Sequence, residues 1–363
     1  MDSSSRSVWS FRRWRFGAGA IALALLCVPS MPASSAGGVT LSETGSTLFY
    51  PLFQLWIPDY IHVAGDVSLT AAATGSGAGV DAVVAGNAHM GASDAYMSDE
   101  QTQKNRGILN IAVAISAQTV NYNIPGLNGT NLKLDGPTLA GIFTGKITTW
   151  DAPAIAAMNP GVQLPHQAIV PIRRQDASGD TFIFTQFLDF SADSWEDNPG
   201  YGTSIAWPAV AAEKTAKGND GVVKTLADTP YSIGYVGISY SKQIADAKLG
   251  AAMIENQSGA FLSPTPETIA DGAAELDPRT PPYERISLVY APGRDSYPLI
   301  NYEYAVVAKS QPDAATAKAL RDFLRWAISQ TGGNAPTYLQ PVGFIALPDF
   351  VRGLSEAQIR EIK

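Results

Sequence analysis

The sequence predicts an α/β protein built of two lobes. Strand-like runs alternate with amphipathic helical patterns along the chain, which is typical of layered α/β folds. The length of 363 residues favours two domains over one. Two long strand candidates, residues 110–123 and 299–309, are rich in β-branched and aromatic residues and lie far apart in sequence. Such strands would serve as hinges where the chain crosses twice between two lobes.

The N-terminus has the three parts of a secretory signal peptide. Four arginines between residues 6 and 15 precede an apolar run over residues 17–28, and small residues follow up to Ala36. The apolar run is shorter than the roughly 20 residues that a membrane-spanning helix needs. We therefore expect residues 1–36 to be a signal peptide, with cleavage after Ala36.

Cys27 is the single cysteine of the chain, and it lies inside this segment. It has two interpretations, a lipid-attachment site or a residue discarded with the signal peptide. Leu25 and Leu26 precede it where lipoprotein signals carry small residues, so the second interpretation is favoured. Localisation is therefore expected in the periplasm or on the extracytoplasmic side of the membrane.

Composition excludes several classes of protein. One cysteine rules out a disulfide framework and thiolate metal sites, and three histidines leave little for a His-rich centre. No metal and no cofactor are expected. A net charge of −8 argues against a nucleic-acid partner, because neutralising phosphates requires clustered Lys and Arg.

A strand-like run followed by a polar turn and a helix occurs three times. The turns are residues 44–47, 74–77 and 174–179, and they are rich in Gly, Ser and Thr. A helix N-terminus exposes unpaired N–H groups and a partial positive charge, which suits a tetrahedral oxyanion. Ser and Thr are also ordinary helix caps, so one such turn is weak evidence. Three turns, one of them carrying Arg174, favour an anion site.

Helix boundaries follow from caps and breakers. Pro58 is expected to end the helix that follows the first turn. A helix is expected over residues 313–329, where apolar residues recur at helical spacing and two glycines follow. A last helix is expected over residues 355–363, with Ser355 as its cap.

Six stretches occur in a specific order and together resemble one known family. The family is that of periplasmic phosphate-binding proteins of the high-affinity phosphate ABC importer (the PstS family), and the resemblance covers the chain from about Thr40 onward. The stretches are TGSTLFYPLFQLW, TGSGAGV, GASDAYMS, TGKITTWDAPAIAAMNPG, IRRQDASGDTFIFTQFL and SIGYVGISY. The resemblance implies a two-lobed periplasmic binding protein of type II, with two mixed-sheet domains joined by a two-strand hinge.

The resemblance implies where the domains divide. Lobe I is expected to be discontinuous, over residues 37–118 and 300–363, and lobe II to cover residues 119–299. The family captures inorganic phosphate between its lobes and delivers it to an importer of two permease and two ATPase subunits. A monomer is expected, with no enzymatic activity.

The resemblance also assigns the site residue by residue. The residues expected to bind phosphate are Ser46, Thr47, Leu48, Ser76, Asp94, Arg174, Ser178, Gly179 and Asp180. Arg174 would present its planar fork to two phosphate oxygens, and Asp176 would hold that fork in place.

Asp94 has a specific chemical interpretation. A carboxylate repels an anion unless the anion donates a proton to it, and phosphate carries a proton near neutral pH where sulfate does not. Asp94 would therefore select phosphate over sulfate or molybdate. Asp180 departs from the family pattern, because many members have Thr there. A second carboxylate would favour a more protonated ligand and change the pH optimum.

An alternative function is a secreted phosphatase or another hydrolase. No Gly-x-Ser-x-Gly nucleophile motif is present. His89 or His166 would have to complete a triad through the fold, which sequence order cannot exclude.

Overall fold

The computed structural model describes residues 38–196 and 199–363, and residues 37–363 form one compact unit. The predicted signal peptide, its cleavage site after Ala36 and Cys27 lie outside the described residues. Within the described ranges, no helix combines the length and apolarity needed to cross a bilayer.

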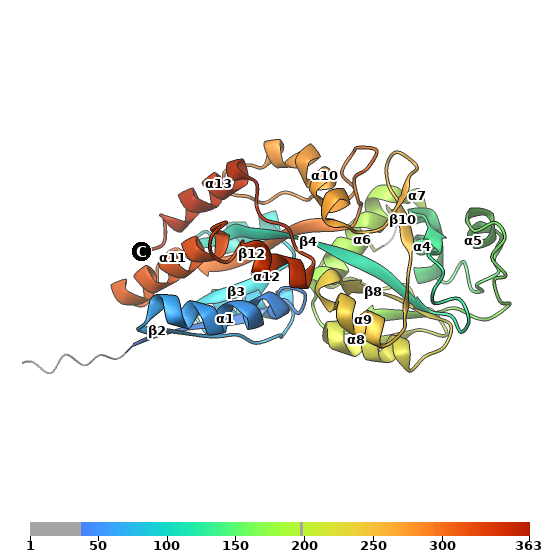
Figure 1. Ribbon diagram of the computed structural model, residues 1–363, viewed down its shortest axis with the longest axis horizontal. Coiled ribbons are helices and arrows are strands. Elements are labelled where there is room, and N and C mark those ends of the chain that lie inside the picture. Colours follow the sequence, from blue (N-terminus) through green and yellow to red (C-terminus); the bar gives the residue numbers. More distant parts are fainter. Residues whose placement is uncertain (1–37, 197–198) are drawn as a thin grey trace, which may run out of the picture. The chain divides into compact units, whose positions relative to one another are not determined.

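The fold is a mixed α/β arrangement around one curled sheet that two lobes share (Figure 1). The sheet runs in the order β2-β1-β3-β12-β4-β8-β6-β7, and β9 also pairs with β4. A small second sheet has the order β11-β10-β5. The strands are β1 (Val39–Gly45), β2 (Val67–Thr70), β3 (Met90–Ser93), β4 (Ile108–Asn123), β5 (Lys133–Leu134), β6 (Val170–Arg174), β7 (Lys214–Ala216), β8 (Ser232–Gly237), β9 (Gly250–Ala251), β10 (Met253–Glu255), β11 (Phe261–Leu262) and β12 (Ile300–Ala308).

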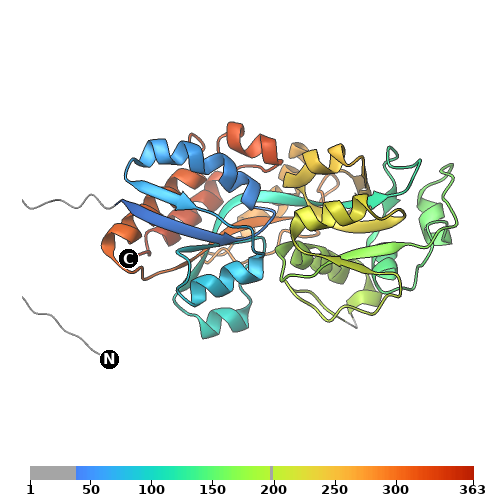
Figure 2. The same ribbon diagram turned by 90° about the horizontal axis from the view of Figure 1, so that it is seen from below.

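Strand β4 belongs to both lobes. Its first part, up to Ala117, pairs antiparallel with β12, and its second part, from Gln118, pairs antiparallel with β8. We call the group β1, β2, β3, β12 and the first part of β4 lobe I, and the group around β8, β6 and β7 lobe II. Figure 2 shows the blue and red elements of lobe I on one side and the green and yellow elements of lobe II on the other. The two segments predicted as hinge strands are thus confirmed as strands, and they are neighbours in the sheet.

Helices cover the faces of the sheet. In lobe I, α1 packs on β2, α2 on β1 and β3, α11 on β1 and β4, and α13 on β4. In lobe II, α8 packs on β8 and β6, and α6 packs on β8 and α4. The helices are α1 (Tyr50–Ala64), α2 (Ser76–Val84), α3 (Asp99–Lys104), α4 (Gly136–Phe143), α5 (Pro153–Met158), α6 (Gly179–Ser191), α7 (Asp193–Glu196), α8 (Gly218–Ala227), α9 (Ser241–Asp246), α10 (Pro266–Leu276), α11 (Ala314–Ile328), α12 (Pro336–Leu339) and α13 (Asp349–Ile359).

The three predicted strand–turn–helix units are confirmed. They are β1 with α1, β2 with α2, and β6 with α6. The predicted helix over residues 313–329 is α11, and the Asp313 carboxylate caps it by accepting from the Thr316 N–H at 2.8 Å. Asp is a favoured N-cap residue, so this cap agrees with the predicted start of the helix.

Two predicted helix boundaries are wrong. Pro58 lies inside α1, which continues to Ala64. Pro58 has no N–H to donate to the Gln54 carbonyl. Gln54 is an exposed residue, so water can take the place of that donor and the helix continues. Ser355 lies inside α13 rather than at its start. Its buried hydroxyl bonds to the Ala112 carbonyl at 2.9 Å, so it serves packing on β4 rather than capping.

A cluster of aromatic rings holds α1 against α11. Phe49, Phe53 and Trp56 contact one another with ring centroids 4.8 to 5.6 Å apart, and Trp56 lies 6.0 Å from Phe323 on α11. The indole Nε1 of Trp56 donates to the Gly333 carbonyl at 2.9 Å. This buried cluster fixes the start of α1, directly after the predicted site residues 46–48.

Candidate anion-binding site

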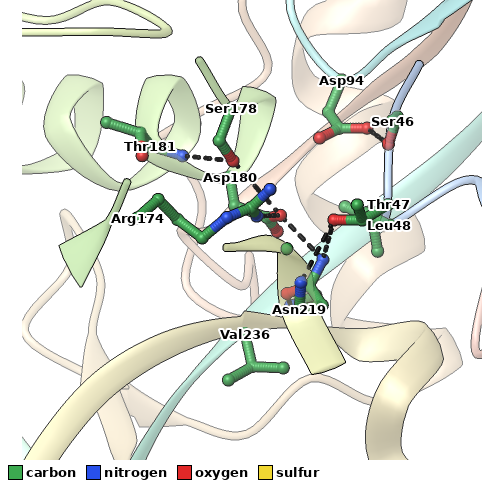
Figure 3. A network of polar contacts seen from close by, with 12 residues as sticks. Ser46, Thr47, Leu48, Asp94, Arg174, Ser178, Asp180, Thr181, Asn219 and Val236 are labelled. Atoms are coloured by element: carbon green, nitrogen blue, oxygen red, sulfur yellow. Dashed lines mark hydrogen bonds and ion pairs between the residues drawn. The ribbon is translucent and has the colours of Figure 1, made fainter. Parts of the chain in front are cut away.

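The predicted site residues come together where the two lobes meet (Figure 3). Ser46, Thr47 and Leu48 precede α1, and Ser76 begins α2. In lobe II, Ser178 is the N-cap of α6, and its Oγ accepts from the Thr181 N–H at 3.3 Å. Three helix N-termini from both lobes therefore gather at one place, which is the feature expected of an oxyanion site.

Asp94 follows β3 and lies among these turns with 1% of its surface exposed. Ser46 Oγ donates to its Oδ1, and Ser76 Oγ donates to its Oδ2 at 3.3 Å. The Asn301 side chain on β12 donates to its backbone carbonyl at 2.8 Å. Burial, followed by the charge of Asp180, raises the pKa of the Asp94 carboxyl.

Arg174 is held by two carboxylates. Its Nε donates to Asp176 Oδ1 at 2.9 Å and its Nη2 to Asp176 Oδ2 at 2.5 Å, and its Nη1 donates to Asp180 Oδ2 at 2.5 Å. Burial opposes the charge, but the contacts with Asp176 and Asp180 raise the pKa of the guanidinium above its ordinary value. The structure thus places Asp176 as expected, on the flat edge of the guanidinium.

Asp180 occupies the donors of lobe II. Besides Arg174 Nη1, its Oδ2 accepts from Asn219 Nδ2 at 2.8 Å and from Ser178 Oγ at 3.5 Å, and its Oδ1 accepts from Gln118 Nε2 at 3.3 Å. The side chain is fully buried. Asp180 therefore engages a guanidinium, two amide groups and a hydroxyl at the centre of the candidate site.

Asn219 is a site residue that our sequence analysis missed. It lies in the first turn of α8, fully buried, and its Nδ2 donates to Thr47 Oγ1 at 2.9 Å. Its Oδ1 accepts from the Gly237 N–H at 2.9 Å, which fixes the orientation of the amide. A fourth helix N-terminus thus joins the site. The GND turn at residues 218–220, which begins a helix after a short strand, was the signal available in the sequence.

The two lobes touch directly around the site. Ser239 Oγ in lobe II donates to the Leu48 carbonyl at 2.7 Å, and the Gly77 N–H in lobe I donates to the Ala177 carbonyl at 3.1 Å. A Cβ at Gly179 would clash with the Asp94 carboxylate, so only glycine allows this approach. The described conformation is therefore closed over the site.

The arrangement offers hydrogen-bond donors and one carboxyl acceptor at the same place. Backbone N–H groups, hydroxyls and one guanidinium are the donors, and the Asp94 carboxyl is the acceptor. Among the described residues, no group of three or more His, Cys, Asp or Glu side chains is arranged to hold a metal ion.

The fold and this site define a class of two-lobed binding proteins, and comparison with known proteins agrees. The family model described as PBP superfamily domain matches residues 31–331. The chain is 32% identical to the phosphate-binding protein PstS of Methanocaldococcus jannaschii, over 90% of this chain and 87% of that protein. It is also 32% identical to PstS of Pasteurella multocida, over 88% of this chain and 89% of that protein.

The chain therefore belongs to the PBP superfamily and, within it, to the PstS family of phosphate-binding proteins. Among solved structures, the phosphate binding protein from Stenotrophomonas maltophilia matches with a TM-score of 0.66 at 20% identity, over 88% of this chain and 94% of that chain. That structure supports the two-lobed fold.

Proposed function

We propose that this protein captures inorganic phosphate between its two lobes and delivers it to an ABC importer. The observation that carries the proposal is the convergence of helix N-termini from both lobes on Asp94 and Arg174 in a chain of the PstS family. A protonated phosphate needs several hydrogen-bond donors and one hydrogen-bond acceptor, and the site offers both kinds of group.

The predicted residues have distinct roles in this proposal. Arg174 and the N–H groups at the start of α6, including Gly179 and Asp180, would bind phosphate oxygens. The hydroxyls of Ser46, Thr47, Ser76 and Ser178 and the Leu48 N–H would complete the donor set. Asp94 would accept the proton that phosphate carries and sulfate lacks.

The proposal includes the surroundings of the protein. We expect it outside the cytoplasmic membrane after removal of residues 1–36, as a monomer that docks on two permease subunits served by two ATPase subunits. We propose that lobe I comprises residues 37–118 and 300–363, and that lobe II comprises residues 119–299. Within the latter range, Glu284 contacts Ser355 and Gln358 of α13, so this segment rests on lobe I.

The relatives are named as binding proteins, and the contacts of the two candidate histidines agree with binding rather than hydrolysis. The ring of His89 bonds to Ser42 Oγ at 2.9 Å, and that of His166 bonds to Asp151 Oδ2 at 2.9 Å. Among the described residues, neither histidine is hydrogen-bonded to a serine of the site.

Titration calorimetry on mature protein, unfolded and refolded to remove bound ligand, tests the proposal. We expect tight one-to-one binding of phosphate and negligible binding of sulfate between pH 5 and 8. Asp94→Asn should reduce the discrimination between the two anions. A folded sample that binds no phosphate would refute the proposed function, and unchanged discrimination in Asp94→Asn would refute the role of Asp94.

A further inference from the structure

A second buried acid lies beside Asp94. Glu303 is on hinge strand β12, at the point where the pairing with β4 is interrupted between Glu303 and Tyr304, and none of its surface is exposed. Its Oε1 accepts from Ser116 Oγ at 2.5 Å. Its Oε2 receives no N–H or O–H donor from the described residues. Asn301, two residues earlier on β12, donates to the Asp94 carbonyl at 2.8 Å, and Tyr304 pairs with Ser93 on β3, so the side chains of Glu303 and Asp94 are neighbours.

Two carboxyl groups can form a hydrogen bond only if one of them carries a proton. The nearby cation does not relieve this requirement, because Arg174 is engaged by Asp176 and Asp180. Burial, followed by the charges of Asp94 and Asp180, raises the pKa of Glu303 well above its ordinary value. The neighbouring strand β4 supplies the neutral hydroxyl of Ser116.

The donors around the pair indicate which carboxyl holds the proton. Asp94 accepts from two hydroxyls, those of Ser46 and Ser76, and it also lies in the field of Arg174. Glu303 accepts from the single hydroxyl of Ser116. Donors stabilise the ionised form of a carboxyl group, so Asp94 is the better carboxylate and Glu303 the better acid.

We propose that Glu303 is a specificity-determining residue that acts through Asp94: as a carboxylic acid it donates a hydrogen bond to Asp94 and keeps Asp94 a proton acceptor toward the ligand. The inference rests on the proposed phosphate function. Without this donor, buried Asp94 would itself take up a proton. A protonated Asp94 can donate to an unprotonated oxyanion, so the selection against sulfate would weaken. Glu303 is therefore a positioning residue that determines which anion the site accepts.

Two substitutions at Glu303 test this role. Glu303→Gln keeps a donor toward Asp94 and an acceptor for Ser116, so we expect phosphate and sulfate affinities within about threefold of wild type. Glu303→Met has similar length and no donor. We expect it to lower the ratio of sulfate Kd to phosphate Kd at least about tenfold.

Glu284 offers a matched control, because it is equally buried and its contacts are with Ala112, Ser355 and Gln358 rather than with Asp94. Glu284→Gln and Glu284→Met should leave the Kd ratio unchanged. A tenfold gain in affinity for both anions in Glu303→Gln would show that wild-type Glu303 is ionised, and it would overturn the proposal. An unchanged ratio in Glu303→Met would also overturn it.

Infrared spectroscopy supplies a readout that needs no ligand. The difference spectrum between wild type and Glu303→Gln at neutral pH should contain the carbonyl stretch of one protonated carboxylic acid, and absence of that band would overturn the proposal. If wild type binds no phosphate, the proposed function fails, but the band still decides the protonation of Glu303. The two failures are therefore distinguishable.

Discussion

Glu284 should make the protein less stable as the pH rises from about 4.5 to about 8. The side chain is fully buried, and its oxygens accept from Ser355 Oγ at 2.6 Å, from Gln358 Nε2 at 2.5 Å and from the Ala112 N–H at 3.3 Å. All three donors are neutral. Burial outweighs them and raises the pKa of Glu284 to about 8.

The sign and size of the effect follow from proton linkage. The folded pKa of about 8 lies above the ordinary value of 4.5, so the folded state binds more protons between these values. The contribution is fully present below about pH 4.5 and is lost as the pH rises through about 8. At about 1.36 kcal/mol per pKa unit, the loss is about 5 kcal/mol. Native domains are stable by only about 5–15 kcal/mol, so the change is large.

Urea unfolding between pH 5 and 9 measures this effect, on wild type, Glu284→Gln and the control Glu275→Gln. Glu275 is exposed on α10, so its substitution should follow wild type at every pH. Glu284→Gln cannot ionise and should gain stability relative to wild type as the pH rises. A wild-type free energy of unfolding that stays constant or increases from pH 5 to 8.5 would refute the reasoning, and so would a difference from Glu284→Gln that does not change with pH.

Three further predictions concern the site. Asn219→Ala removes the donor to Thr47 Oγ1 and to Asp180, and calorimetry should show phosphate affinity reduced about tenfold, as expected for loss of about 1.4 kcal/mol. Asp180→Asn removes a like charge from the anion position, so phosphate should bind at least about tenfold more tightly at pH 8, with a smaller gain at pH 5. Gly179→Ala should weaken phosphate binding in calorimetry and lower the melting temperature, because the added Cβ clashes with the Asp94 carboxylate in the closed conformation.

The local units of this fold could be predicted from sequence because their signals are local. The turns at 44–47 and 174–179 each combine a strand end, polar turn residues and helical spacing within about 20 residues, and the helix over 313–329 combines helical spacing with a two-glycine stop. Arg174 was a candidate from the turn that carries it, whereas Asp94 became a site candidate only through the family's motifs. The motif order also correctly indicated that they lie together.

Features that depend on contacts between distant segments could not be predicted. Asn219 meets Thr47 across 172 positions, and Ser355 bonds to Ala112 across 243 positions. Ser355 was predicted to be a helix cap because capping preference is a local property of the sequence. The carbonyl to which it donates belongs to Ala112 on β4, far away in the sequence. Likewise, nothing in the local sequence distinguishes Glu303 from an ordinary strand residue, because its position beside Asp94 depends on how β12 pairs in the sheet.

The charges around the site explain why a proton on the ligand must matter. Arg174 faces Asp94, Asp176 and Asp180, so the ionised groups near the site carry more negative than positive charge even with Glu303 neutral. Net attraction therefore cannot come from the sum of side-chain charges. It has to come from oriented N–H groups and hydroxyls, which act only at short range and in fixed directions. An anion that also donates a proton to Asp94 turns one repulsion into a hydrogen bond, and an anion without a proton cannot do so.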